Sequence, residues 1–72
     1  MESKTLIFGK NTGPHTAEAR ETYRKNRVPF EYFDVLKDPE AMARMIRYTR
    51  GKRLVPVIVE GEEVQIGFAG GS

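Results

Sequence analysis

The sequence of 72 residues contains no cysteine and only one histidine. Without cysteine the chain forms no disulfide, no thiolate metal site and no redox thiol of its own. A single histidine also excludes a multi-histidine metal site within one chain. No segment approaches the roughly 20 apolar residues that span a bilayer, and Met1–Lys4 does not lead into the apolar core of a signal peptide. We therefore predict a cytoplasmic protein with no metal site and no membrane partner.

An excess of charge of one sign is also missing. The chain has 12 basic and 10 acidic side chains and a net charge of +2. Six of its seven arginines fall into two groups, one in residues 20–27 and one in residues 44–50. The two groups lie on different expected helices, on opposite faces of the sheet, and interleaved acidic residues dilute their charge. Dispersed charge of this kind argues against nucleic-acid binding. The length predicts one domain, residues 1–72, with a thin core.

The pattern of apolar residues, prolines and turn residues predicts six elements. They are a strand at Thr5–Phe8, a helix at Thr16–Asn26 with Pro14 in its first turn, a strand at Phe30–Val35, a helix after Asp38, and strands at Val57–Val59 and Glu63–Ile66. A helix between the first two strands predicts that they are parallel. The last two strands follow a tight turn and must be antiparallel. We expect an α/β fold, with a mixed four-stranded sheet and helices on both faces.

The second helix has the clearest boundaries. Asp38 is placed as its N-cap and Pro39 as its first residue, and Gly51 is expected to be its C-cap. Its apolar stripe follows the i, i+3, i+4, i+7 rule, through Met42, Met45, Ile46 and Thr49. We therefore interpret the two methionines as core residues.

Five short segments, in order, resemble the glutaredoxins of the thioredoxin fold. They are Lys10–Thr16, where that family has a lysine before Cys-Pro-Tyr-Cys, then Arg27–Pro29, Asp34–Glu40, Lys52–Pro56 and the glycine-rich Gly67–Gly71. The resemblance covers nearly the whole chain. The chain is similar to a compact branch with a Cys-Pro-Tyr-Thr or selenocysteine-Pro-Tyr-Thr site and a short Gly-Phe-x-Gly ending. Full glutaredoxins end with another helix, and we expect this C-terminal helix to be absent here.

The departure from the family lies at its catalytic position. Gly13 stands at the position of the nucleophile and Thr16 at that of the second cysteine. The resemblance implies a thiol–disulfide redox protein that is inactive as written, because glycine has no side chain to attack a disulfide. Since one base separates a glycine codon from the selenocysteine codon, we hypothesise that Gly13 is a recoded or substituted position.

The resemblance also implies a glutathione site, with a cis peptide bond before Pro56 and no bound cofactor. Its residues would be Lys10, Lys52, Arg53, Val55, Pro56, Gly70 and Gly71. Glutathione or a thiol/disulfide protein would be the partner. The alternative is a non-catalytic module that binds glutathione, a peptide or a protein.

Each of these residues also has a plainer interpretation. Gly13 fits a turn before a helix, and His15 and Thr16 fit its first turn. Lys10, Lys52 and Arg53 fit solvated surface positions, and Gly70 and Gly71 fit a frayed end. Without a further helix, we also expect a poorly covered sheet face beyond the first helix, and with it self-association as a homodimer or low stability.

Overall fold

The computed structural model describes residues 4–70. The elements are β1 (Thr5–Gly9), α1 (Pro14–Lys25), β2 (Phe30–Asp34), α2 (Pro39–Thr49), β3 (Val57–Glu60) and β4 (Glu63–Ile66). The predicted order is confirmed, and the boundaries move by one or two residues. Gly9 and Glu60 extend their strands, α1 begins at Pro14, and β2 ends at Asp34 rather than Val35.

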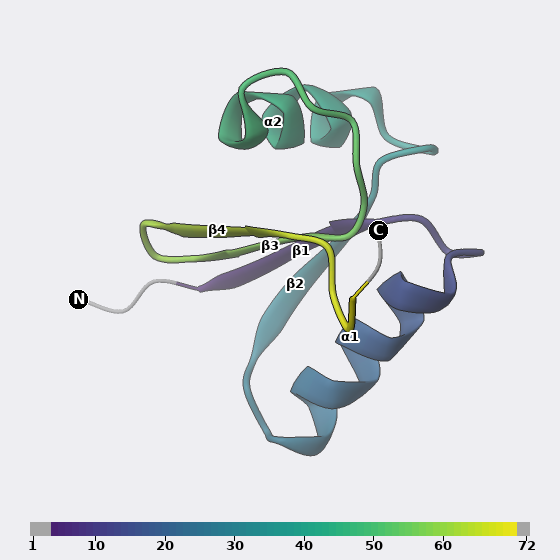
Figure 1. Cartoon of the computed structure of the whole chain (residues 1–72), viewed down its shortest axis with the longest axis vertical. Helices are drawn as coiled ribbons and strands as arrows, with labels where there is room; N and C mark the ends of the chain where they lie inside the picture. The colour runs from purple at the N-terminus through teal and green to yellow at the C-terminus, as the bar shows by residue number, and fades with distance from the viewer. Residues whose placement is uncertain (1–3, 71–72) are drawn as a thin grey trace.

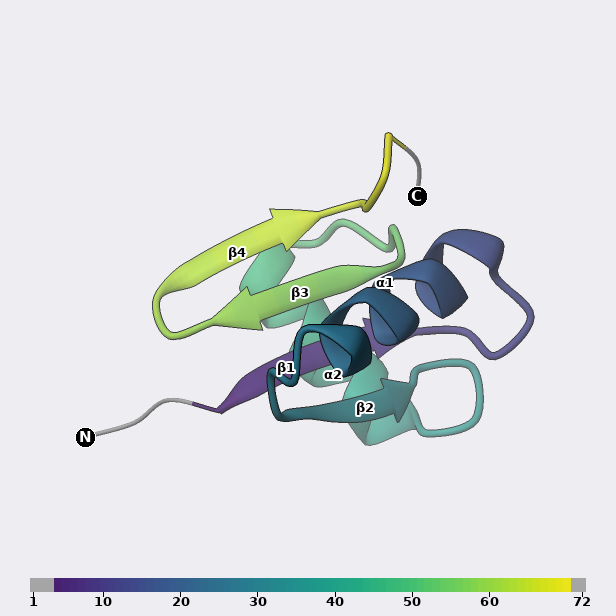
Figure 2. The ribbon, with the colours of Figure 1, turned by 90° about the horizontal axis from the view of Figure 1, so that it is seen from below.

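The strands form one sheet in the order β2-β1-β3-β4. Strand β1 pairs in parallel with β2 and antiparallel with β3, and β3 pairs antiparallel with β4. Figure 2 shows β2 and β4 at the two outer edges. This is the mixed four-stranded sheet of a thioredoxin-like α/β fold, as predicted from the sequence.

The two helices cover opposite faces of the sheet (Figure 1). On the α2 face, Phe8, Val57 and Val59 pack with Met45 in one buried cluster. On the α1 face, Ile7 and Ile58 pack with Ala19 in a second, smaller cluster. Successive residues of β1 and β3 thus supply opposite faces, which is why both strands read as continuous apolar runs.

The large apolar side chains left exposed at the sheet lie on the α2 side, not beside α1. Val64 pairs with Val59 and Ile66 with Val57, and directly opposed residues of an antiparallel pair share a face. Val64 is 39% exposed and Ile66 is 37% exposed. On the α1 face, Phe68 packs against the cluster instead. The prediction of a poorly covered face beyond the first helix was therefore wrong in its position.

Helix α2 ends one residue earlier than Gly51 suggests. Arg50 is the C-cap and adopts the left-handed conformation, with φ of 61° and ψ of 43°. Gly51 follows with φ of 102°, and its N–H donates to the carbonyl of Ile46 at 2.9 Å. Arg50 and Gly51 therefore turn the chain toward β3 together. In the part of the chain that the structure describes, no helix has the length and apolar character needed to cross a membrane.

Candidate functional site

The end of β1, the start of α1 and the loop before β3 meet at one end of the sheet. They enclose a small cavity of about 100 Å³, lined by Lys10, Gly13, Pro14, His15, Thr16 and Val55. The first five of these are close in sequence, whereas Val55 comes from a distant loop. The fold thus brings the predicted nucleophile position next to the segment that precedes Pro56.

Backbone hydrogen bonds close the loop between β1 and α1. The N–H of Gly13 donates to the carbonyl of Lys10 at 3.0 Å, and the N–H of Ala17 donates to the carbonyl of Gly13 at 3.0 Å. The hydroxyl of Thr16 accepts from the N–H of Lys10 at 3.4 Å. Thr16 is 1% exposed, so this hydroxyl is a fixed part of the site.

Gly13 is buried, but its backbone does not require glycine. Its φ of −83° and ψ of 125° lie in the extended region that every residue adopts. A Cβ atom at this position would lie 3.0 Å from Cγ of Lys10 and 3.3 Å from Oγ1 of Thr16. The lysine side chain is flexible enough to give the few tenths of an ångström required. A side chain at position 13 would therefore lie between the side chain of Lys10, which carries an ammonium group, and the hydroxyl of Thr16.

The start of α1 is electrostatically open to an anion. Gly13 is the N-cap and supplies no side-chain hydrogen bond, and the first turn contains no acidic residue. The first N–H groups of a helix have no partners within the helix and carry the positive end of its dipole. An anionic atom at position 13 would meet these groups, with Lys10 close by.

The loop before β3 is tied to the end of β4. The Val55–Pro56 peptide bond is cis. The carbonyl of Pro56 accepts a hydrogen bond of 2.7 Å from the N–H of Gly67. Pro56 is buried, whereas Val55 is half-buried and reaches the cavity.

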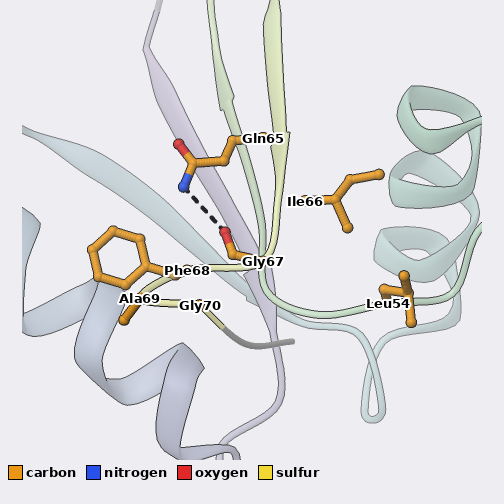
Figure 3. Close-up of a pocket in the computed structure, with 7 residues that line it drawn as sticks. All are labelled: Leu54, Gln65, Ile66, Gly67, Phe68, Ala69 and Gly70. Atoms are coloured by element: carbon orange, nitrogen blue, oxygen red, sulfur yellow. Dashed lines mark hydrogen bonds between the residues drawn. The ribbon is translucent and has the colours of Figure 1, made fainter.

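A second, wider pocket of about 370 Å³ lies at the end of β4. Its lining residues are Leu54, Gln65, Ile66, Gly67, Phe68, Ala69 and Gly70. Figure 3 shows Leu54 and Ile66 on the side of α2, and Gln65 and Phe68 on the side of α1. The amide of Gln65 donates to the carbonyl of Gly67 at 3.1 Å and fixes the turn after β4.

The structure brings together only part of the predicted site. Lys10, Gly13, Thr16 and Val55 line the small cavity, whereas the next residue, Pro56, is buried and does not line it. Gly70 lines the second pocket. Lys52 and Arg53 are exposed on the loop before β3 and line neither pocket, and Gly71 lies outside the described residues.

Sequence reasoning gave too little weight to His15. It is half-buried in the cavity wall, and its buried Nδ1 has no hydrogen-bond partner among the described residues. A histidine directly after the proline that starts α1 was the available signal. Leu54, Gln65 and Ile66 were missed as pocket residues because the sequence shows them only as loop and strand positions.

Two tyrosines outside the small cavity have raised pKa values. Burial raises the pKa of Tyr23, and the negative charge of Glu60 and a hydrogen bond to it add to the effect. Burial also raises the pKa of Tyr32, and the charge of Asp34 adds to this while Arg20 opposes it. Arg20 lies over the ring of Tyr32, 3.9 Å from its centroid. Both tyrosines pack on the α1 face, and the hydroxyl of Tyr32 donates to Oδ1 of Asn11 at 2.7 Å, in the loop between β1 and α1.

The fold and the site define a protein of the thioredoxin-fold class, with its site at the start of the first helix. The sequence profile of the glutaredoxin family matches residues 5–64. The chain therefore belongs to the glutaredoxin family. A comparison with curated protein sequences gives no match.

Several solved structures share this fold. The glutaredoxin Grx-1 from Archaeoglobus fulgidus has a TM-score of 0.80 and 25% identity, over 92% of this chain and 76% of that one. The thioredoxin-like protein BC3987 has a TM-score of 0.81 and 31% identity, over 90% of this chain and 88% of that one. The glutaredoxin-like NrdH-redoxin from Escherichia coli has a TM-score of 0.78 and 26% identity, over 92% of this chain and 84% of that one.

Proposed function

We propose that this chain is a thiol–disulfide redox protein of the glutaredoxin family whose own site lacks the nucleophile. The observation that carries the proposal is the meeting of Lys10, Gly13, Thr16 and Val55 around one cavity at an uncapped helix start. This arrangement would supply the surroundings of a redox thiol, and the sulfur is missing. The chain as written is therefore inactive in thiol exchange, and its place of action is the cytoplasm.

The proposed chemistry needs one atom that glycine does not supply. In the exchange reaction a thiolate attacks one sulfur of a disulfide, a new S–S bond forms, and the second sulfur leaves as a thiolate that takes up a proton. The helix start and Lys10 would stabilise the attacking anion. The backbone of Val55 is the proposed partner for the extended backbone of glutathione or of a peptide. Lys52, Arg53 and Gly70 would meet its carboxylates from outside the cavity.

The test is a gain of function at position 13. We expect Gly13→Cys to reduce a mixed disulfide between glutathione and a small thiol, with glutathione as the reductant. Gly13→Ser is the matched control, because its side chain has nearly the same size and carries no thiol. A folded Gly13→Cys protein that is no faster than Gly13→Ser would refute the inherited redox site.

The recoding hypothesis has a separate test. The mass of the tryptic peptide that contains position 13, from protein made in its native host, distinguishes glycine from cysteine and selenocysteine. A glycine mass together with a glycine codon in the gene rules out recoding, and the native protein is then non-catalytic at this position.

A second candidate function is binding without chemistry. The observation that favours it is the cavity beside the buried Gly13. Its lining includes His15, whose buried Nδ1 has no hydrogen-bond partner among residues 4–70. We expect millimolar glutathione to shift the amide resonances of Lys10, Val55 and Gly70 in the unmodified chain. Glutathione whose thiol is replaced by a methyl group should produce the same shifts, since no exchange is involved. Unchanged spectra with both ligands would remove this candidate.

A further inference from the structure

We propose that two copies of this chain form a symmetric dimer through the free edge of β4. Strand β4 is the last strand of the sheet and pairs only with β3. An exposed strand edge is a template for another strand, and proteins usually protect such edges with charges, bulges or covering loops. Here the edge carries two exposed aliphatic residues, Val64 and Ile66.

The hairpin geometry indicates which backbone groups are free. Glu60 pairs with Glu63 across a turn of two residues, and Gly61 has the positive φ of 62° that the first position of a II′ hairpin turn requires. The pair that closes such a turn is hydrogen-bonded, and hydrogen-bonded pairs alternate along the strand. The N–H and C=O groups of Val64 and Ile66 therefore point away from β3, toward the free edge.

One antiparallel register satisfies these groups and the side chains together. In a twofold pair centred on Gln65, Val64 lies opposite Ile66 of the second copy, and the relation repeats by symmetry. Both residues then exchange backbone hydrogen bonds, and four aliphatic side chains become contiguous on the α2 face. A pair centred on Val64 would instead place Ile66 opposite Glu62 of the second copy. The first register is therefore preferred.

Charge complementarity selects a second copy as the occupant. The hairpin turn is acidic, with Glu62 and Glu63, and the loop before β3 is basic, with Lys52 and Arg53. Within residues 4–70 none of these four side chains forms an ion pair. The hairpin turn and this loop lie at opposite ends of β4 (Figure 1). An antiparallel pair thus brings each acidic turn to the end of β4 where the basic loop of the other copy enters the sheet. Glu63 lies on the α1 face with Gln65 and the loop lies on the α2 side, so the attraction is between the net charges of the turn and the loop.

The other outer edge does not offer the same surface. At this edge Glu31 of β2 pairs with Lys4, which precedes β1, at 4.0 Å, and none of the apolar residues of β2 is among the exposed large ones. Leu54, which is 46% exposed beside Ile66, extends the apolar surface only at β4. Because β4 has only four residues, the interface is small, so the dimer is weak, concentration-dependent and sensitive to salt.

Charge swapping in the full chain tests the proposal by sedimentation velocity over a range of concentrations and salt. We expect the native chain to dimerise. Two double variants are used, Lys52→Glu/Arg53→Glu and Glu62→Lys/Glu63→Lys. Each double variant by itself should raise the dimer dissociation constant by about tenfold or more, because like charges then face each other. An equimolar mixture of the two variants should form a heterodimer, since every turn then meets a loop of opposite charge.

Two further variants keep the outcome decisive. Lys25→Glu/Lys37→Glu makes the same change of net charge as Lys52→Glu/Arg53→Glu, at exposed positions away from β4, and it should leave the dimer unchanged. Ile66→Lys should abolish the dimer while its circular dichroism spectrum stays native. A native chain that remains monomeric overturns the proposal. So does a dimer that is insensitive to the β4 variants, or a mixture of the charge variants that stays monomeric.

Discussion

The two helices of this small protein begin in opposite ways. At α2, the carboxylate of Asp38 accepts from the N–H groups of Glu40 at 3.0 Å and Ala41 at 3.4 Å, and Glu40 adds a negative charge to the first turn. At α1, Gly13 offers no side chain and no acid follows it. Both helices start with a proline, so the contrast lies in the cap and in the charge of the first turn. One helix start is completed for stability, and the other keeps its N–H groups available for a ligand or a reacting atom.

The largest expected effect of this contrast is on a thiol placed at α1. In Gly13→Cys, the open helix start and Lys10 should lower the thiol pKa by at least one unit from its ordinary value of about 8.5. The measurement is the pH dependence of thiolate absorbance in the ultraviolet. A pKa at or above the ordinary value would show that the start of α1 does not stabilise an anion.

The same shift should appear in the stability of that variant. Because the folded pKa is depressed, the extra stability is fully present above the unfolded pKa and is lost as the pH falls through the folded pKa. Urea unfolding of Gly13→Cys and Gly13→Ser across this window gives the difference. The two free energies of unfolding should converge in acid and diverge in alkali.

A middle-sized effect is expected at the completed helix start. Asp38→Ala removes both capping hydrogen bonds and should lower the free energy of unfolding by about 1 kcal/mol. Asp38→Asn is the matched control, because asparagine caps nearly as well without the charge. If Asp38→Ala is as stable as the unmodified chain, the capping hydrogen bonds of Asp38 do not stabilise the protein, and the contrast between the two helix starts does not affect its stability.

The smallest effect is expected from completing the start of α1. Gly13→Asp should raise the free energy of unfolding by about 0.5 kcal/mol at neutral pH, through the cap and the helix dipole. Gly13→Asn separates the two causes, since it keeps the cap and lacks the charge. The advantage of aspartate over asparagine should vanish as acid protonates the carboxyl. A stability loss in both variants would mean that position 13 does not accept a side chain.

The order and pairing of the elements followed from local signals in the sequence. Pro39 after Asp38 fixed the start of α2, and the run Val57–Val59 after Pro56 predicted a strand. The C-cap was predicted one residue too late, at Gly51, because glycine is the usual residue in the left-handed conformation at a helix end. In the structure, Arg50 is the C-cap and adopts this conformation. Residue type alone does not reveal that shift by one position.

The site was only partly predictable for a physical reason. Lys10, Gly13 and Thr16 are near in sequence, so a motif could find them. The contact with Val55 depends on how the loop before β3 packs, and the resemblance alone supplied it. The exposed Lys52 and Arg53 show the limit of such a transfer, because no local pattern states which way a loop side chain points.

The contact between Gly9 and Thr16 has a consequence for how this protein can change. A methyl group on Gly9 would lie 2.6 Å from the Thr16 hydroxyl, so the last residue of β1 and the first turn of α1 leave no room between them. The carbonyl of Gly9 is also bound by the N–H of Val35 at 2.9 Å. The segment from Lys10 to Gly13 is thus anchored at both ends by neighbours outside itself. We therefore expect that residues of this segment, including the one at position 13, can be replaced over evolution while β1 and α1 keep their positions.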